Sequence, residues 1–141
     1  MSVRGATHHV DFSVTDLTRS RPFYQAVLGF MGYAAGEDYG ARGTDYDLRT
    51  PASFCSIGIR VSKGANAART HDRYAPGLHH IAWNADSRAD VDALYALLQR
   101  IDATILDSPA DYSHIPQYGE GYYAVFFADP DGLKLEYVFK P

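Results

Sequence analysis

The chain is poor in the features that define several protein classes. Its 141 residues include one cysteine, Cys55, which excludes an intrachain disulfide and is typical of a reducing compartment. No apolar run approaches the ~18 residues of a membrane span, and the opening segment MSVRGATHHVDF lacks the apolar core of a signal peptide. Lys and Arg form no cluster and the net charge is −4. We therefore expect a cytoplasmic protein with no membrane or nucleic-acid partner.

The overall composition is that of a folded globular domain. Apolar residues make up 46% of the chain and charged residues 21%. A chain of this length buries about two-thirds of its unfolded surface, so it needs neither metal nor disulfide to fold. The 7 Phe and 11 Tyr residues fit either an aromatic-lined cleft or a core filled with aromatic rings. Composition leaves both interpretations open.

An internal repeat divides the chain into two halves. The segments HHVDFS (8–13) and HHIAWN (79–84) share two histidines, a β-branched residue, an aromatic residue and a small polar residue, at an offset of 71 residues. The similarity continues in phase for some twenty positions, in which Phe23, Tyr24 and Val27 match Leu94, Tyr95 and Leu98. We predict one domain over residues 1–141, made of repeats at about 7–61 and 78–140 joined by a polar linker at 62–76.

Each repeat is predicted to form a strand, a helix and three further strands, which gives an α+β fold. In the first repeat the strands are expected at 8–14, 31–36, 45–49 and 54–61, and a helix at 19–28, capped by Asp16 or Thr18 and followed by Gly29. In the second repeat they are expected at 78–85, 104–106, 122–127 and 133–139, and a helix at 88–100, capped by Ser87 with Asp90 in its first turn. The irregular stretch 110–121 is either a lid over a cleft or a long loop.

Strand alternation separates the candidate site residues from their neighbours. Alternate side chains of a strand point to opposite faces. His9, His80 and Glu136 lie on the more polar face of their strands, whereas His8 and His79 are expected on the face that packs against the helix. The polar faces must then look toward water or toward a shared concavity.

Two imidazoles and one carboxylate form a facial triad for a divalent metal with open positions for water or substrate. His9, His80 and Glu136 are therefore the candidate metal ligands. This donor set suits Zn, Ni, Mn and Fe(II) alike, so the sequence does not identify the metal. A metal held in this way can act as a Lewis acid or generate a bound hydroxide.

Three further side chains are candidates for contact with a small-molecule substrate. Asp11 shares a face with His9 and is either a general base or a carboxylate at the rim of the site. Lys134, next but one to Glu136, could offset negative charge on the substrate. Tyr122 is expected to face the cleft with Ala124 and Phe126. Glu136 could itself carry a proton, which makes it the candidate catalytic residue.

Three ordered motifs in the chain resemble the vicinal oxygen chelate superfamily, which includes glyoxalase I, bleomycin-resistance proteins, fosfomycin-resistance thiol transferases and extradiol dioxygenases. The motifs are HVDFSVTDL…FYQAVLGF (9–30), GLHHIAW (77–83) and YYAVFFADPDGLKLE (122–136). The resemblance implies paired βαβββ modules whose curled mixed sheets form a metal cleft, in a homodimer. It also implies that His9, His80 and Glu136 bind the metal.

The chain departs from each named activity of that superfamily. The segment FCSIGIRV (54–61) lacks the carboxylate that glyoxalase I has on the corresponding strand, which argues against a glyoxalase I or epimerase assignment. Phe126 replaces the tyrosine that extradiol dioxygenases have ten residues before their glutamate, and those enzymes are about twice as long. Fosfomycin transferases have an arginine shortly after the last strand, where this chain ends at Pro141.

Two functions therefore remain open. The first is a metal-dependent lyase, isomerase, thiol transferase or dioxygenase that chelates a small oxygenated molecule. The second is a metal-free protein that sequesters a small aromatic or cationic compound, as bleomycin-resistance proteins do. The complete triad favours the enzyme, because the antibiotic-binding members generally lack it.

Overall fold

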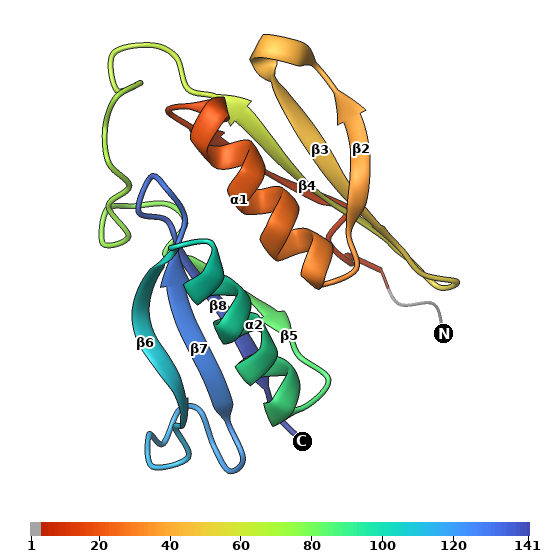
Figure 1. Ribbon diagram of the computed structural model, residues 1–141, viewed down its shortest axis with the longest axis vertical. Coiled ribbons are helices and arrows are strands. Elements are labelled where there is room, and N and C mark those ends of the chain that lie inside the picture. Colours follow the sequence, from red (N-terminus) through yellow and green to blue (C-terminus); the bar gives the residue numbers. More distant parts are fainter. Residues whose placement is uncertain (1–3) are drawn as a thin grey trace. The chain divides into compact units, whose positions relative to one another are not determined.

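The structure, a computed structural model, describes residues 4–141, which belong to two compact units, Met1–Arg69 and Thr70–Pro141. In each unit one long helix lies across one face of a four-stranded mixed sheet (Figure 1). The element order is strand, helix and three strands in both units. The predicted α+β fold of two tandem βαβββ modules is thus confirmed.

The first unit is built around the parallel pairing of its first and last strands. Its elements are β1 (His9–Val14), α1 (Leu17–Phe30), β2 (Ala34–Asp38), the short 3₁₀ helix η1 (Gly40–Arg42), β3 (Gly43–Arg49) and β4 (Phe54–Val61). The strand order is β1-β4-β3-β2, with β1 parallel to β4 and the other pairs antiparallel. Of the two expected caps for α1, Asp16 is the one used, since its Oδ1 accepts the Thr18 N–H at 2.8 Å.

The second unit repeats this topology. Its elements are β5 (His80–Asn84), α2 (Arg88–Arg100), β6 (Thr104–Asp111), β7 (Tyr123–Ala128) and β8 (Lys134–Phe139). The strand order is β5-β8-β7-β6, with β5 parallel to β8. Ser87 caps α2 as predicted, by accepting the Asp90 N–H at 3.1 Å. Asp90 Oδ2 in turn accepts the Asp86 N–H at 3.0 Å. This contact satisfies the backbone donor of the residue that precedes the cap.

Each helix buries its apolar stripe against its own sheet. The buried helix residues are Phe23, Tyr24, Val27 and Leu28 in α1, and Val91, Leu94 and Leu98 in α2. They cover the sheet face that carries Phe12 and Ile59 in one unit and Phe127 and Leu135 in the other. Among residues 4–141, no helix has both the length and the apolar character needed to cross a bilayer. We call the sheet face opposite each helix the distal face.

Two predicted strands have a boundary that is wrong by three residues or more. The helix α1 includes Gly29 and ends at Phe30, and Gly32 then takes a positive φ of 96°, so β2 starts at Ala34 rather than at residue 31. Strand β6 continues to Asp111, past the predicted end at residue 106. It is an edge strand with irregular register, and Pro109 and its polar neighbours hide the strand pattern.

Candidate functional site

Both units carry the same arrangement of paired histidine rings. The Nδ1 atoms of His8 and His9 lie 3.0 Å apart, and those of His79 and His80 lie 2.7 Å apart. The rings meet nearly edge to face in both pairs, at interplanar angles of 87° and 74°. A hydrogen bond between two Nδ1 atoms requires one of them to carry the proton. When His9 and His80 are the donors, their Nε2 atoms have free lone pairs.

The first histidine of each pair, His8 or His79, packs on an aromatic ring. His8 lies 4.9 Å from the Phe54 ring, and His79 lies 5.6 Å from the Tyr74 ring, measured between centroids. The prediction that His8 faces the helix is wrong, since it lines the same pocket as His9 on the distal face. His8 precedes β1, so strand alternation does not apply to it. Partial desolvation, together with the adjacent His80, lowers the pKa of His79, which suits a neutral acceptor ring.

In the second unit, His80 and Glu136 lie side by side. The parallel register of β5 and β8 pairs His80 with Lys134 and Ala82 with Glu136. His80 Nε2 lies 3.2 Å from Glu136 Oε2, and Glu136 is only 1% exposed. The sequence predicted that this face looks toward water or toward a cleft. The Glu136 side chain is instead buried within its own unit.

Three tyrosines pack on the sheet face that carries Glu136. Ala124, Phe126 and Val138 form a buried cluster on the distal face, and the rings of Tyr112, Tyr118 and Tyr122 pack against it. We call these three rings the tyrosine cover. Tyr118 and Tyr122 stack with centroids 4.5 Å apart and planes 17° apart. The segment between β6 and β7, which the sequence left open as a lid or a loop, is therefore packed on the face that carries Glu136.

Tyr122 lies where alternation predicted it, on the same face as Ala124 and Phe126. Its hydroxyl donates a hydrogen bond to Glu136 Oε1. Burial, reinforced by this hydrogen bond, raises the pKa of Tyr122 above its usual range. The neutral hydroxyl therefore remains a donor to the carboxylate. The residue that pairs with Glu136 across β7 and β8 is Phe126. Tyr122 is not the strand partner of Glu136, because it precedes the first residue of β7.

Lys134 is directed to the same face. Its Nζ lies 4.6 Å from the centroid of the Phe126 ring, a cation–π contact. Phe126 also packs edge to face on Tyr112, at 5.5 Å between centroids. The distal face of the second unit thus brings the buried Glu136 carboxylate, the His80 imidazole and the Lys134 ammonium group together with aromatic rings.

In the first unit, His9 opens onto a pocket of about 480 Å³, which we call the His9 pocket. Its walls come from all four strands and from the turn after β2. The lining residues are His8, His9, Asp11, Gly36, Glu37, Tyr39, Asp45, Asp47, Phe54, Ser56 and Arg60. Four of these carry carboxylates, so the pocket suits a hydroxylated or cationic group better than a bare apolar one.

Arg60 and Asp45 belong to this pocket but were missed by the sequence interpretation. Arg60 Nη2 donates to Asp45 Oδ1 at 2.7 Å and lies 3.7 Å from Asp11 Oδ2. The Tyr39 hydroxyl donates to Asp45 Oδ2 at 3.0 Å, which raises the pKa of that tyrosine. Alternation along residues 54–61 and 45–49 would have placed these side chains on one face. The sequence does not reveal the strand register that brings side chains of β3 and β4 into one pocket with His9.

Two carboxylates from the neighbouring strands lie over the middle of β4, which carries no carboxylate of its own. Gly58 of β4 pairs with Asp11 of β1 and with Asp45 of β3. A Cβ at residue 58 would lie 2.2 Å from Asp11 Oδ1 and 2.8 Å from Asp45 Oδ1. Glycine therefore leaves room for both carboxylates above the centre of the sheet.

The three predicted metal ligands belong to different units, His9 to the first, and His80 and Glu136 to the second. Within either unit, the described residues contain no group of three or more His, Cys, Asp or Glu side chains placed to hold an ion. The His80–Glu136 pair nevertheless fits two ligands of one ion. Two atoms bound at roughly 2.1 Å from a metal, at octahedral to tetrahedral angles, lie roughly 3.0–3.4 Å apart. The 3.2 Å separation is in that range.

A family model described as the Glyoxalase/Bleomycin resistance protein/Dioxygenase superfamily matches residues 6–137. The chain belongs to this superfamily. This confirms the resemblance seen in the three sequence motifs. Among the relatives of this superfamily member is YqjT, an uncharacterized protein of Bacillus subtilis strain 168, which is 29% identical over 131 residues, or 93% of this chain and 96% of YqjT.

Two further similarities are informative. The 2-epi-5-epi-valiolone epimerase of an Actinomyces species is 29% identical over 153 residues, which cover 96% of this chain and 80% of that protein. The crystal structure of a candidate glyoxalase from Bacillus halodurans matches this superfamily member with a TM-score of 0.79 and 29% identity. That match covers 97% of both chains.

Proposed function

We propose that this superfamily member is a divalent-metal-dependent enzyme that chelates a small oxygenated substrate, with His9, His80 and Glu136 as metal ligands. The observation that carries the proposal is the 3.2 Å separation of His80 Nε2 and Glu136 Oε2, which matches two ligands of one ion. Zn, Ni, Mn and Fe(II) all accept two imidazoles and a carboxylate. A divalent ion bound there would stabilise negative charge on two neighbouring substrate oxygens.

The residues around the proposed ligands support this role. The Nδ1 contacts of His8 and His79 orient the rings of His9 and His80 so that Nε2 is the coordinating atom. The Tyr122 hydroxyl fixes one oxygen of Glu136, which leaves Oε2 beside His80. Contacts of this kind hold metal ligands in place before the ion binds.

Among the superfamily's reaction types, we propose an isomerase reaction that moves a proton. The relative named 2-epi-5-epi-valiolone epimerase supports this class, and its name indicates a hydroxylated substrate. Inversion of a carbon next to a carbonyl requires a base that removes the proton and an acid that returns it to the opposite face. Asp11 and Glu136 are the proposed proton carriers, and Lys134 and Tyr122 are proposed to contact the substrate.

The hydroxylated substrate class also fits the His9 pocket. The Asp11 and Asp45 carboxylates could accept hydrogen bonds from substrate hydroxyls, and Arg60, which donates to Asp45 and lies 3.7 Å from Asp11, holds them on one wall. The absence of a carboxylate on β4, which argued against an epimerase from the sequence, is offset by these two carboxylates over Gly58. These two carboxylates support the proposed epimerase class.

The test measures metal content before activity. Untagged protein is loaded with Zn, Ni, Mn or Fe(II), desalted and analysed for bound metal, alongside His80→Ala, Glu136→Gln and the matched control His114→Ala. We expect close to one metal per site in the parent and the control, and loss of metal in the other two variants. Loaded protein is then incubated in D₂O with 2-epi-5-epi-valiolone and with simpler hydroxyketones, and deuterium uptake beside the carbonyl is followed by NMR.

The second candidate function is a metal-free binding protein. The tyrosine cover and the aromatic rings beneath it support this candidate, because such surfaces bind aromatic or cationic compounds. A parent protein that retains no metal after loading with all four ions would contradict the enzyme proposal and favour the binding protein.

A further inference from the structure

A second pocket of the first unit has the opposite charge to the His9 pocket. It has a volume of about 670 Å³ and is lined by Ser13, Tyr39, Arg42, Arg60, Val61 and Lys63. Three of these six residues are cationic and none is acidic. We call it the Arg42 pocket. It shares the Tyr39 and Arg60 walls with the His9 pocket, so the two pockets adjoin.

The cations of the Arg42 pocket differ in how many hydrogen bonds and ion pairs they already form. Arg60 donates to Asp45 at 2.7 Å and to the Thr44 and Ile59 carbonyls at 3.2 and 3.1 Å, so its hydrogen-bonding capacity is largely occupied. Arg42 and Lys63 are exposed, and neither forms an ion pair within residues 4–141; the Arg42 guanidinium lies 6.0 Å from the centroid of the Tyr39 ring, a contact that leaves its N–H donors unoccupied. In a chain of net charge −4, these two side chains are free to meet an external anion.

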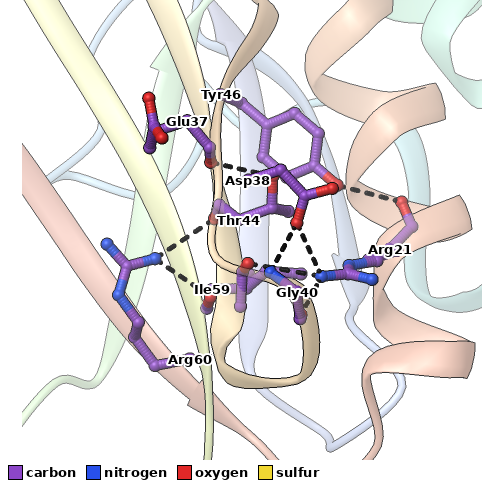
Figure 2. Close-up of polar contacts among 9 residues, drawn as sticks. Arg21, Glu37, Asp38, Gly40, Thr44, Tyr46, Ile59 and Arg60 are labelled. Carbon is purple, nitrogen blue, oxygen red and sulfur yellow. Dashed lines mark hydrogen bonds and ion pairs between the residues drawn. The ribbon is translucent and has the colours of Figure 1, made fainter.

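The turn that carries Arg42 is held in place from the helix (Figure 2). Arg21 of α1 donates to the Gly40 carbonyl, to the Gly43 carbonyl at 3.3 Å and to Asp38 Oδ1 at 3.2 Å. Asp38 Oδ1 also accepts the Gly40 N–H at 2.8 Å. These contacts hold η1 in one conformation before any ligand binds, which reduces the entropic cost of binding.

Gly43 brings this turn close to β4. Its φ is 145°, and a Cβ at this position would lie 2.0 Å from the Ile59 carbonyl oxygen. Only glycine allows the two strands to approach so closely here. Arg42 directly precedes Gly43, and Lys63 lies two residues after β4 ends at Val61. Both side chains therefore line the same pocket.

We infer that the Arg42 pocket binds an oxyanion, either a phosphate or a carboxylate group, through Arg42 and Lys63, with the exposed Ser13 hydroxyl as a further donor. A guanidinium and an ammonium group on one concave wall are the usual donors for such groups. Because the His9 pocket adjoins it, a substrate of the proposed enzyme would extend from its chelating oxygens to an anionic group here. This extension rests on the proposed function, whereas the anion site itself does not.

The experiment titrates the full-length, metal-free protein with inorganic phosphate and, in a separate arm, with acetate. Ionic strength is kept constant with sodium chloride, and the amide resonances of Arg42, Gly43 and Lys63 are followed by NMR. We expect saturable shifts with a dissociation constant on the order of millimolar for at least one anion. The arm that saturates identifies the group as phosphate or carboxylate.

Two double variants with the same change in net charge distinguish a specific anion site from nonspecific electrostatic attraction of anions to the protein. Arg42→Gln/Lys63→Gln removes the proposed donors, and Arg100→Gln/Lys140→Gln removes two cations in the second unit. We expect binding about tenfold weaker in the first double variant and unchanged in the second. Shifts that do not saturate with either anion, or equal weakening in both variants, would overturn the site. Neither result depends on metal binding or activity, so failure here is separate from failure of the proposed enzyme.

Discussion

Gly58 and Asp11 face each other across β4 and β1, and the glycine leaves the space that the Asp11 carboxylate fills. Replacement of Gly58 by alanine would place a methyl group 2.2 Å from Asp11 Oδ1 and 2.9 Å from Arg60 Nη1. We expect Gly58→Ala to lower the free energy of unfolding by about 1–3 kcal/mol, because the carboxylates must move and the contacts of Arg60 are disturbed. Urea denaturation monitored by circular dichroism measures this change.

Gly29→Ala is the matched control for that prediction. Gly29 lies in α1, and a Cβ there meets nothing within 4 Å. Alanine at this position should stabilise the protein by about 0.5–1 kcal/mol, because it favours the helix. If both variants had the same stability as the parent, the close approach at Gly58 would not be a constraint in solution.

Tyr122→Phe tests the hydrogen bond that holds Glu136. The substitution keeps the stacked ring on Tyr118 but leaves Glu136 Oε1 without its hydroxyl donor in a buried environment. We expect a loss of about 1–3 kcal/mol in the free energy of unfolding, again from urea denaturation. Tyr118→Phe removes a hydroxyl with no side-chain hydrogen bond within residues 4–141 and should change stability by less than about 0.5 kcal/mol. Equal effects would mean that the hydroxyl of Tyr122 is not the important group.

Asp111 provides a pH-dependent prediction. Hydrogen bonds from Ser113 Oγ, from the Ser113 N–H and from Arg88 lower its pKa from 3.8 to about 2. A carboxyl whose pKa is lower in the folded state stabilises the fold above pH 3.8 and loses that contribution as the pH falls toward 2. A carboxyl carbon NMR titration should therefore find a midpoint near 2 in the parent.

Ser113→Ala should raise that midpoint toward 3.8, since it removes the hydroxyl that donates to Asp111 Oδ1. Ser108→Ala, on the same strand, is the control and should leave the midpoint unchanged. A midpoint that stays near 2 in Ser113→Ala would assign the shift to Arg88 and to the backbone N–H of residue 113, which the substitution keeps.

His79→Ala tests whether the paired histidine positions a metal ligand. The His79 ring is the hydrogen-bonding partner of His80 Nδ1, so its loss leaves the His80 ring free to rotate. If His80 binds metal as proposed, we expect affinity to fall about 10–100-fold, measured by competition with a metal chelator. His114→Ala, whose ring lies near Tyr112 instead, should keep the parent affinity. Unchanged affinity in His79→Ala would contradict a positioning role.

The fold was predictable because its signals are local and repeated. Alternation located strand 54–61, and Ser87 located helix 88–100, each with the boundaries that the structure has. Strand β6 was less visible because Pro109 and its polar neighbours interrupt the alternation on an edge strand. Sequence periodicity reports which face a side chain takes only where the backbone is regular, and His8 shows the limit of that rule.

The site was predictable in part, and the missing part depends on contacts between distant strands. Alternation placed Tyr122 on the correct face, but the direction in which its hydroxyl reaches Glu136 depends on the packing of the tyrosine cover. Arg60 and Asp45 become neighbours only through the register of β3 and β4. The metal set of His9, His80 and Glu136 and the homodimer both stay predictions, the first tested by metal analysis and the second by analytical ultracentrifugation.

The pairing of the first strand of each unit with its last has a consequence for how the chain forms on the ribosome. Strand β1 has β4 as its sheet neighbour, and β5 has β8, so neither early strand can complete its ladder until the end of its own half has emerged. Closing these long loops costs chain entropy before any pairing is gained. Each histidine pair therefore acquires its final surroundings in the last step of its half's assembly, and a nascent chain that stalls before β8 would leave β5 without a partner.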